Sequence, residues 1–329
     1  MGHLPSNAST GAAQGRWLNS FDLLRLLAAT AVIFHHVAPL SGAPVRRVFS
    51  TDFGELGVGV FFVISGYLVT ASWRRAPELG AFLKKRILRI EPALVVSLAL
   101  TALVLGAFAT TLPLGDYVQT PQVWLYVLRN TLLYPVTYEL PGVFAHNPLP
   151  DTVNGSLWTL RLEFSCYLLV AALGLARLLT LRIVAGLAAA AGAVFLVLHV
   201  ARPELGATGL PRLVDIAALN GFLFLAGAFL NLRDRPVPVW VAVLLAPLIL
   251  TPAWIFGLPA LVVVVGSLRS VRLPADISYG LYIYAFPLQQ VLATQGQLTF
   301  VTAFAATAPV ALASWFLVEK PALRLKPKA

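Results

Sequence analysis

Ten long apolar stretches constrain this chain more than any other feature of its sequence. They lie roughly at residues 20–40, 56–73, 90–112, 156–176, 183–200, 213–231, 238–250, 252–268, 276–295 and 300–318. A helix needs about 20 apolar residues to cross the ~30 Å of hydrocarbon in a bilayer. Charged residues make up only 12% of the 329 residues, about half of the ~25% of an ordinary globular protein. The sequence therefore predicts an all-α fold: a polytopic membrane bundle of about ten transmembrane helices.

The basic residues predict how this bundle is oriented. The net charge of +10 would suggest nucleic acid in a soluble chain, whereas in a membrane protein basic residues collect in cytoplasmic loops. With both termini inside, the inner segments hold 17 of the 24 Lys and Arg residues. The outer segments hold five, namely Arg46, Arg47, Arg129, Arg202 and Arg212, and the spans contain Arg25 and Arg161. We therefore expect both termini to lie in the cytoplasm and the protein to reside in the inner (cytoplasmic) membrane. We expect no nucleic-acid partner.

The chain is expected to form a single membrane domain. We assign residues 1–18 to a cytoplasmic N-terminal segment, residues 19–320 to the membrane domain and residues 321–329 to a basic cytoplasmic tail. Residues 1–18 are polar and show no cleavable signal peptide. The longest loop, about residues 113–155, is expected on the outer side, where its moderately apolar part, residues 123–134, could lie along the membrane interface.

Four polar residues in the first span are candidates for function, because a charged side chain inside a membrane costs about 2.5–3.5 kcal/mol on insertion scales. Arg25 and His36 are 11 residues apart, which places them about 20° from the same helix face and ~16 Å apart along the axis. Asp22 lies about 40° from His36, whereas His35 falls about 80° from Arg25. Asp22 and Arg25 could instead be interfacial anchors, and His36 a hydrogen-bonded packing residue.

Glu163 in the fourth predicted span is a candidate partner for His36. It lies roughly 10 Å from the outer end of its span, and His36 roughly 6 Å from the outer end of the first. A histidine and a carboxylate at similar depths could form a general-base pair, in which the carboxylate orients the imidazole and stabilises its protonated form. Glu163 could also pair with Arg161 or with another buried cation.

Two arginines at the cytoplasmic edge of the third predicted span point to anion binding. Arg86 and Arg89 are three residues apart, so they share one helix face, and paired guanidinium groups bind phosphate well. A positive-inside anchor would explain them equally well. Near them, Gly57, Gly59 and Gly66 would permit close helix packing.

Six pieces of the sequence, in this order, resemble the membrane-bound acyltransferase-3 family. They read FDLLRLLAATAVIFHH, GVGVFFVISGYLV, KKRILRIEPAL, GSLWTLRLEF, ISYGLYIYAFP and LVEKPALRL. Together they run from about residue 20 to residue 325, nearly the whole chain. The resemblance implies O-acylation, usually O-acetylation, of a carbohydrate or glycoconjugate hydroxyl by an acyl-CoA donor from the cytoplasm.

The resemblance also implies roles for individual residues. Arg25, Arg86 and Arg89 would bind the anionic parts of acetyl-CoA, His36 would act as general base, and Glu163 would assist it. Supporting positions in the matched pieces are Asp22, His35, Trp158, Tyr279, Tyr282 and Glu319. The expected partners are therefore acyl-CoA, a carbohydrate acceptor and the lipid bilayer. We expect neither a metal site nor a permanently bound cofactor.

The chain departs from the family pattern at several positions. Ala285 stands where many members have a histidine, and Arg161 stands where a small residue usually follows the WTL motif. The first departure argues against a mechanism that needs a second histidine there. A proton-coupled secondary transporter or a lipid or glycan flippase is the alternative function, because intramembrane acidic, basic and histidine residues also relay protons.

Overall fold

The computed structural model describes residues 20–48, 50–204, 208–268 and 273–327. The predicted N-terminal segment 1–18 and the end of the predicted tail lie outside these residues. The helices are α1 (Ser20–Leu40), α2 (Phe53–Arg75), α3 (Leu79–Ala99), α4 (Gly106–Ala109), α5 (Leu114–Gln119), α6 (Pro121–Thr131), α7 (Leu157–Leu175), α8 (Leu181–Phe195), α9 (Gly209–Leu232), α10 (Val239–Leu245), α11 (Trp254–Ser267), α12 (Ser278–Thr294), α13 (Phe300–Ser314) and α14 (Lys320–Arg324). Three π-helical turns (Leu100–Leu105, Leu196–Ala201 and Trp315–Glu319) and a 3-10 turn (Ala246–Leu250) extend them. Two-residue strands β1 (Arg47–Val48) and β2 (Thr51–Asp52) form one antiparallel pair. The all-α class is thus confirmed.

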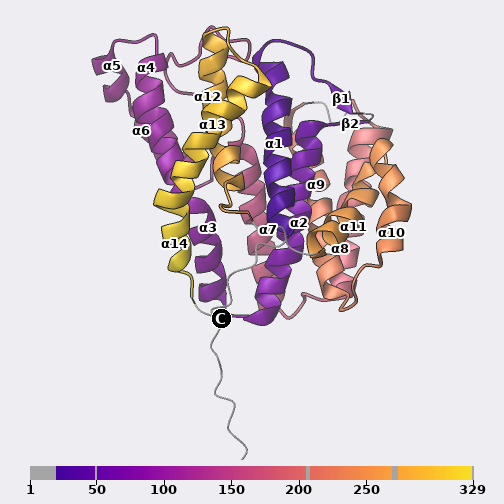
Figure 1. The fold of residues 1–329 in the computed structure, drawn as a ribbon. Helices are drawn as coiled ribbons and strands as arrows, with labels where there is room; N and C mark the ends of the chain where they lie inside the picture. Colours follow the sequence, from indigo (N-terminus) through magenta and orange to yellow (C-terminus); the bar gives the residue numbers. More distant parts are fainter. Residues whose placement is uncertain (1–19, 49, 205–207, 269–272, 328–329) are drawn as a thin grey trace, which may run out of the picture.

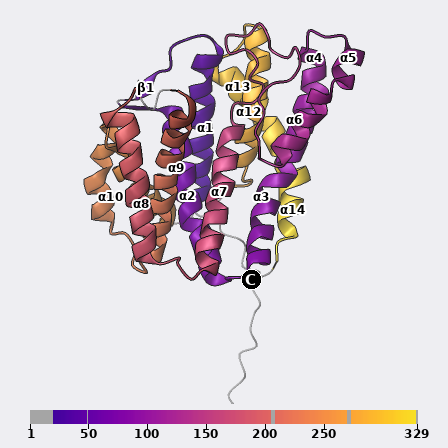
Figure 2. The same ribbon diagram turned by 180° about the vertical axis from the view of Figure 1, so that it is seen from behind.

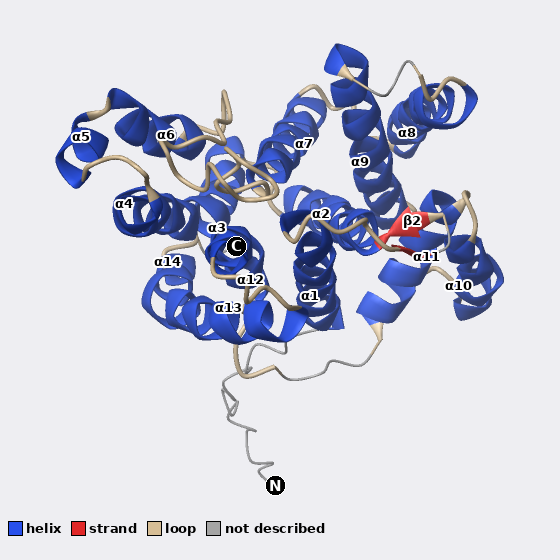
Figure 3. Cartoon of the chain, turned by 90° about the horizontal axis from the view of Figure 1, so that it is seen from above, coloured by secondary structure: helices blue, strands red, loops and turns tan. Residues whose placement is uncertain are grey.

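Helix α2 is the central helix of the bundle. It packs against α1, α7, α9 and α11. Figure 3 shows α8–α11 on one side of it, and α3–α6 with α12–α14 on the other. Its glycines allow this close packing, as the sequence predicted. A Cβ on Gly66 would lie 1.9 Å from the carbonyl oxygen of Phe224 in α9, and a Cβ on Gly57 would lie 2.7 Å from the carbonyl oxygen of Ala28 in α1.

Seven helices are long and apolar enough to cross a membrane among the described residues. They are Ser20–Leu40, Phe53–Arg75, Leu79–Ala109, Leu157–Leu175, Leu181–His199, Gly209–Leu232 and Phe300–Arg324. The remaining three predicted crossings form shorter helices: Val239–Leu250, Trp254–Ser267 and α12. The count of ten therefore stays a prediction, because these three are shorter than the ~20 residues that a perpendicular crossing requires.

Helix α2 ends and α3 begins at the same end of the bundle (Figures 1 and 2), and basic residues lie in these two helix ends. We call this the basic end; its residues include Arg74, Arg75, Lys84 and Lys85. The ends of α7 and α9 lie there too, since a Cβ on Gly174 would contact the ring of Trp73 and the Arg74 guanidinium donates to the carbonyl oxygen of Asn231 at 2.9 Å. The opposite end, where α1 leads through β1 and β2 into α2, carries His35 and His36 and is called the histidine end.

The segment predicted to lie along the membrane interface contains a helix that packs on the bundle. Helix α6 contacts α3 and the π-helical turn that follows it. It buries Val123, Tyr126 and Asn130, while Trp124 and Leu128 on its other face are exposed. Such an amphipathic helix suits a position with one side on protein and the other toward lipid or interface.

Candidate active site

A cavity of about 540 Å³ extends into the bundle from the basic end. Its lining follows α2 from Arg75 to Val58, a rise of about 25 Å for 17 residues. Residues of α1, α3, α7 and α12, Asp276 before α12 and the C-terminal residues Trp315, Leu323, Lys326 and Pro327 form the rest of the wall. Of the predicted site residues, the lining includes Asp22, Arg25, Arg86, Arg89, Glu163, Tyr279 and Tyr282, and it does not include His35, His36, Trp158 or Glu319.

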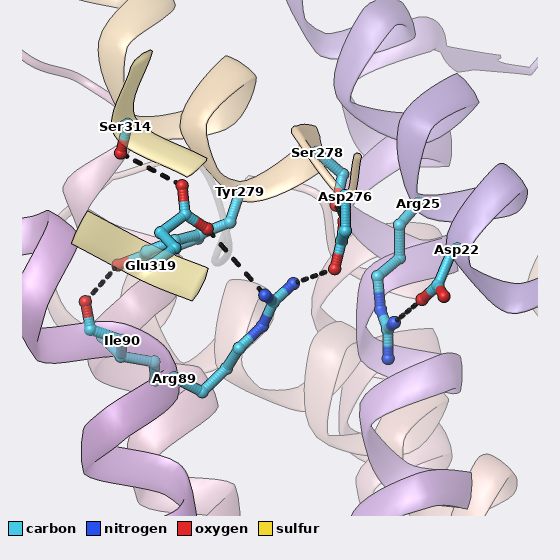
Figure 4. A network of polar contacts seen from close by, with 9 residues as sticks. All are labelled: Asp22, Arg25, Arg89, Ile90, Asp276, Ser278, Tyr279, Ser314 and Glu319. Carbon is cyan, nitrogen blue, oxygen red and sulfur yellow. Dashed lines mark hydrogen bonds and ion pairs between the residues drawn. The ribbon is translucent and has the colours of Figure 1, made fainter. Parts of the chain in front are cut away.

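Arg89 is held by carboxylates on both sides (Figure 4). Its Nη2 atom donates to Asp276 Oδ2 at 2.8 Å, and its Nη1 atom lies 3.8 Å from Glu319 Oε2. Ser314 and Ser278 donate hydrogen bonds to Glu319 and Asp276 at 3.1 and 2.7 Å. Arg89 thus joins α3, the segment before α12 and the π-helical turn Trp315–Glu319.

Asp276 lies in the segment before α12, and the charges of this cluster act on its pKa. Burial alone would raise the pKa of Asp276, but the guanidinium of Arg89, with Arg25 beyond it, lowers the pKa to about 2. Arg25 itself donates to Asp22 Oδ1 at 2.7 Å, one turn earlier on α1 (Figure 4). Two of the three predicted phosphate-binding arginines therefore already have a carboxylate partner.

Arg86 differs from Arg25 and Arg89 in the groups that surround its guanidinium. Its guanidinium lies over the rings of Phe82 and Tyr167, at 5.8 and 5.7 Å from the ring centroids. Within the described part of the chain, no carboxylate lies within ion-pair distance of it, and its buried Nε atom has no hydrogen-bond partner. A planar cation that lies over two aromatic rings, lines a cavity and has no carboxylate within ion-pair distance is suited to bind an anionic ligand.

Glu163 lies in the same cavity but not beside His36. Its Oε1 atom accepts hydrogen bonds from Ser65 Oγ, at 2.5 Å, and from the Tyr167 hydroxyl one turn along α7. The predicted contact between Glu163 and His36 is therefore not formed. The estimate compared depths along the helix axis, which does not determine which side chains face one another.

The two histidines occupy different environments at the histidine end. His36 packs edge-on against Phe286 with ring centroids 4.9 Å apart, and its buried Nδ1 atom has no partner among the described residues. His35 lies against Gly54 of α2. Because Val58 follows Gly54 by four residues, His35 lies about 6 Å along α2 beyond the inner end of the cavity.

Asp52 is a residue of this region that the sequence analysis missed. Its Oδ1 atom lies 3.0 Å from His35 Nδ1 and also accepts the backbone N–H of Glu55 at 2.8 Å, so it caps α2. Burial alone would raise the pKa of Asp52, but the contact with His35 and the capping hydrogen bonds lower it. The sequence carried a signal, since Asp52 and Glu55 have the spacing of a helix-capping pair before an apolar run.

The remaining predicted residues are packing or positioning residues by their contacts. Trp158 packs against the main apolar core, and the Tyr279 hydroxyl donates to the carbonyl oxygen of Ile90 at 3.0 Å. The Tyr282 hydroxyl lies 2.6 Å from Thr159 Oγ1. Ala285 is buried in a small apolar cluster with residues of α1 and α13, so its position carries no proton-transfer group.

Comparison with known proteins identifies the chain. The acyltransferase-3 family model, described as an acyltransferase domain, matches residues 18–320. The chain belongs to the acyltransferase-3 family. This membership supports a membrane acyltransferase over a transporter, and none of the known structures matches the chain.

The relatives differ in how much of this chain they match. An "O-acetyl transferase" of Shigella phage Sf6 is 31% identical over 94% of this chain and 98% of its own length. "Nodulation protein 10" of Rhizobium leguminosarum bv. viciae is 38% identical, and "Acyltransferase MdmB" of Streptomyces mycarofaciens is 28% identical, each over 46% of this chain. These two matches span 42% and 38% of the relatives' own lengths.

Proposed function

We propose that this protein is a membrane O-acyltransferase that moves a short acyl group, acetyl in the first place, from acyl-CoA to a hydroxyl of a carbohydrate or glycoconjugate. The observation that carries the proposal is the cavity at the basic end with the unpaired guanidinium of Arg86 in its wall. The phage relative named O-acetyl transferase, which matches over nearly its whole length, supports the acetyl group. The positive-inside rule places the basic end in the cytoplasm, where acyl-CoA is found.

The charges of the cavity suit an acyl-CoA molecule entering from this end. Arg86, with Lys85 and Arg75 near the mouth, would bind its phosphates, and Arg89 would position the wall through Asp276 and Glu319. Further in, the carboxylate of Glu163 would accept a hydrogen bond from an amide N–H of the pantetheine arm. This places the thioester near the inner end of the cavity, below the histidines.

The chemical step would use His36 as general base. His36 removes the proton of the acceptor hydroxyl, and the oxygen attacks the thioester carbonyl. The new C–O bond forms, the C–S bond breaks, and the CoA thiolate takes the proton from His36. The acceptor approaches from the histidine end, so donor and acceptor meet from opposite sides of the membrane.

Donor binding by matched arginine variants tests this proposal. Titration of the purified protein with acetyl-CoA should show that Arg86→Ala weakens binding at least about 10-fold, since a hydrogen bond to a charged group contributes about 1.5–3 kcal/mol. Arg74→Ala is the control, because Arg74 lies at the same end but pairs with the exposed Asp234 outside the cavity. Equal effects of the two substitutions would reject the cavity as the donor site.

Sidedness tests the orientation separately. Sealed inverted vesicles expose the cytoplasmic face and should release CoA from added acetyl-CoA, while right-side-out vesicles should not. Equal release by both preparations would contradict a donor site that opens only at the basic end.

A further inference from the structure

Two aromatic rings lie near the inner end of the cavity, about one turn of α2 before Val58. Phe61 of α2 and Tyr282 of α12 both line the cavity, and their rings meet edge to face with centroids 5.5 Å apart. Phe61 also packs against the small apolar cluster that contains Ala29 and Ile33 of α1. The two rings thus fill the space between α1, α2 and α12.

The Tyr282 ring is fixed in place. Its hydroxyl bonds to Thr159 Oγ1 at 2.6 Å and donates to the carbonyl oxygen of Ser156 at 3.3 Å, and the residue is 7% exposed. One turn further along α12, Phe286 contacts the ring of His36. Tyr282 and Phe286 therefore stand in series between the cavity and His36.

The lining beside these rings carries both polar and apolar side chains. Ser65, Thr159 and Glu163 line the cavity there together with Val58, Phe62 and Leu160. A thioester carbonyl or an amide can accept or donate hydrogen bonds with the polar groups, whereas burying an alkyl chain beside a carboxylate gains little. A long acyl chain therefore meets the two aromatic rings at the inner end of the cavity.

We infer that Phe61 and Tyr282 form an end wall that restricts the donor to thioesters of short acyl groups, of about two or three carbons. This inference rests on the proposed function, since it assigns the acyl end of the donor to the inner end of the cavity. It also requires the Phe61 ring to shift when the acyl group is passed to the acceptor at His36, because the Tyr282 ring is held by its hydrogen bonds.

Binding of CoA thioesters of increasing chain length tests the end wall without an acceptor. The purified protein is titrated with CoA, acetyl-CoA, butyryl-CoA and hexanoyl-CoA. We expect the wild type to bind hexanoyl-CoA at least about 10-fold more weakly than acetyl-CoA, because a single methylene that a pocket cannot accommodate already changes selectivity about 10- to 200-fold. In Phe61→Ala this difference should fall to within about threefold.

A second variant keeps the test decisive if Phe61→Ala does not fold. Phe61→Leu removes less volume, and its difference in affinity between acetyl-CoA and hexanoyl-CoA should lie between those of the wild type and Phe61→Ala. Phe108→Ala is the control, because it removes the same ring from a side chain that is 89% exposed, and it should retain the wild-type difference. Equal binding of acetyl-CoA and hexanoyl-CoA to the wild type, or an unchanged difference in both Phe61 variants, would overturn the end wall. If neither CoA nor acetyl-CoA binds the wild type, the proposed function fails instead.

Discussion

The cavity and the histidine end differ in the surroundings of their polar residues. In the cavity, guanidinium and carboxylate groups surround open space, and each of Arg25 and Arg89 already has an anionic partner. At the histidine end, His36 is packed against an aromatic ring and does not line the 540 Å³ cavity. Under the proposed function, the donor site would exist before the donor arrives, and the reaction site would become accessible to the thioester only when side chains between the two regions move.

The largest expected effect separates the two histidines. We predict that His36→Ala lowers acetyl transfer by about 10²–10⁴-fold, the usual cost of removing a general base, while acetyl-CoA still binds with wild-type affinity. His35→Ala should retain measurable turnover, because its ring contacts Asp52 rather than lying in line with Arg25. Transfer rates and acetyl-CoA titrations of both variants provide the check, and an inactive His35→Ala beside a near-normal His36→Ala would reverse the assignment.

The next effect concerns stability rather than catalysis. Arg89→Ala would leave the buried carboxylates of Asp276 and Glu319 without their cation, and breaking a buried pair costs about 3 kcal/mol or more. Arg86→Ala removes no carboxylate partner and should cost much less. Thermal unfolding of both variants in the same detergent measures this difference. A larger loss of stability in Arg86→Ala would show that Arg86 is the structural residue and Arg89 the free one.

Much of this architecture could be predicted from the sequence, because lipid leaves few choices to an apolar chain. The apolar stretches predicted the long helices, and the glycines of residues 57–66 predicted the close contacts of α2. The partners of the charged residues could not be predicted in this way. Arg86 and Arg89 share one helix face and look equivalent in the sequence, yet only Arg89 meets carboxylates, which come from segments about 190 and 230 residues away.

The same limit explains why Glu163 was expected beside His36 and why Asp52 was not expected beside His35. Helix depth compares positions along one axis, but it does not say which helices are neighbours. Glu163 is directed into the cavity by its hydrogen bonds with Ser65 and Tyr167, while Asp52 reaches His35 from the short connection between α1 and α2. Local capping geometry, rather than depth, was the sequence signal that could have found it.

A smaller effect should appear in the pH dependence of stability. The pKa of Asp276 is lowered from its ordinary 3.8 to about 2 in the folded protein. The stabilisation is therefore fully present above pH 4, and it decreases as the pH falls toward 2, by about 2 kcal/mol in total. Unfolding temperatures of the detergent-solubilised protein between pH 6 and pH 2.5 should show this loss, and Asp276→Asn should reduce it. An unchanged acid dependence in Asp276→Asn would place the responsible group elsewhere.

The smallest predicted effect tests whether Glu163 acts in donor binding within the cavity or together with His36. If its carboxylate accepts a hydrogen bond from the donor's arm, Glu163→Gln replaces a charged acceptor by a neutral one, a difference of about 1 kcal/mol. The acetyl-CoA dissociation constant should then rise about fivefold, whereas His36→Ala should leave it unchanged. Glu78→Gln is the control, since Glu78 lies outside the cavity at the start of α3. A Glu163→Gln variant with normal donor affinity but reduced turnover would instead join Glu163 to His36, and the acyl group would then have to react within reach of both residues.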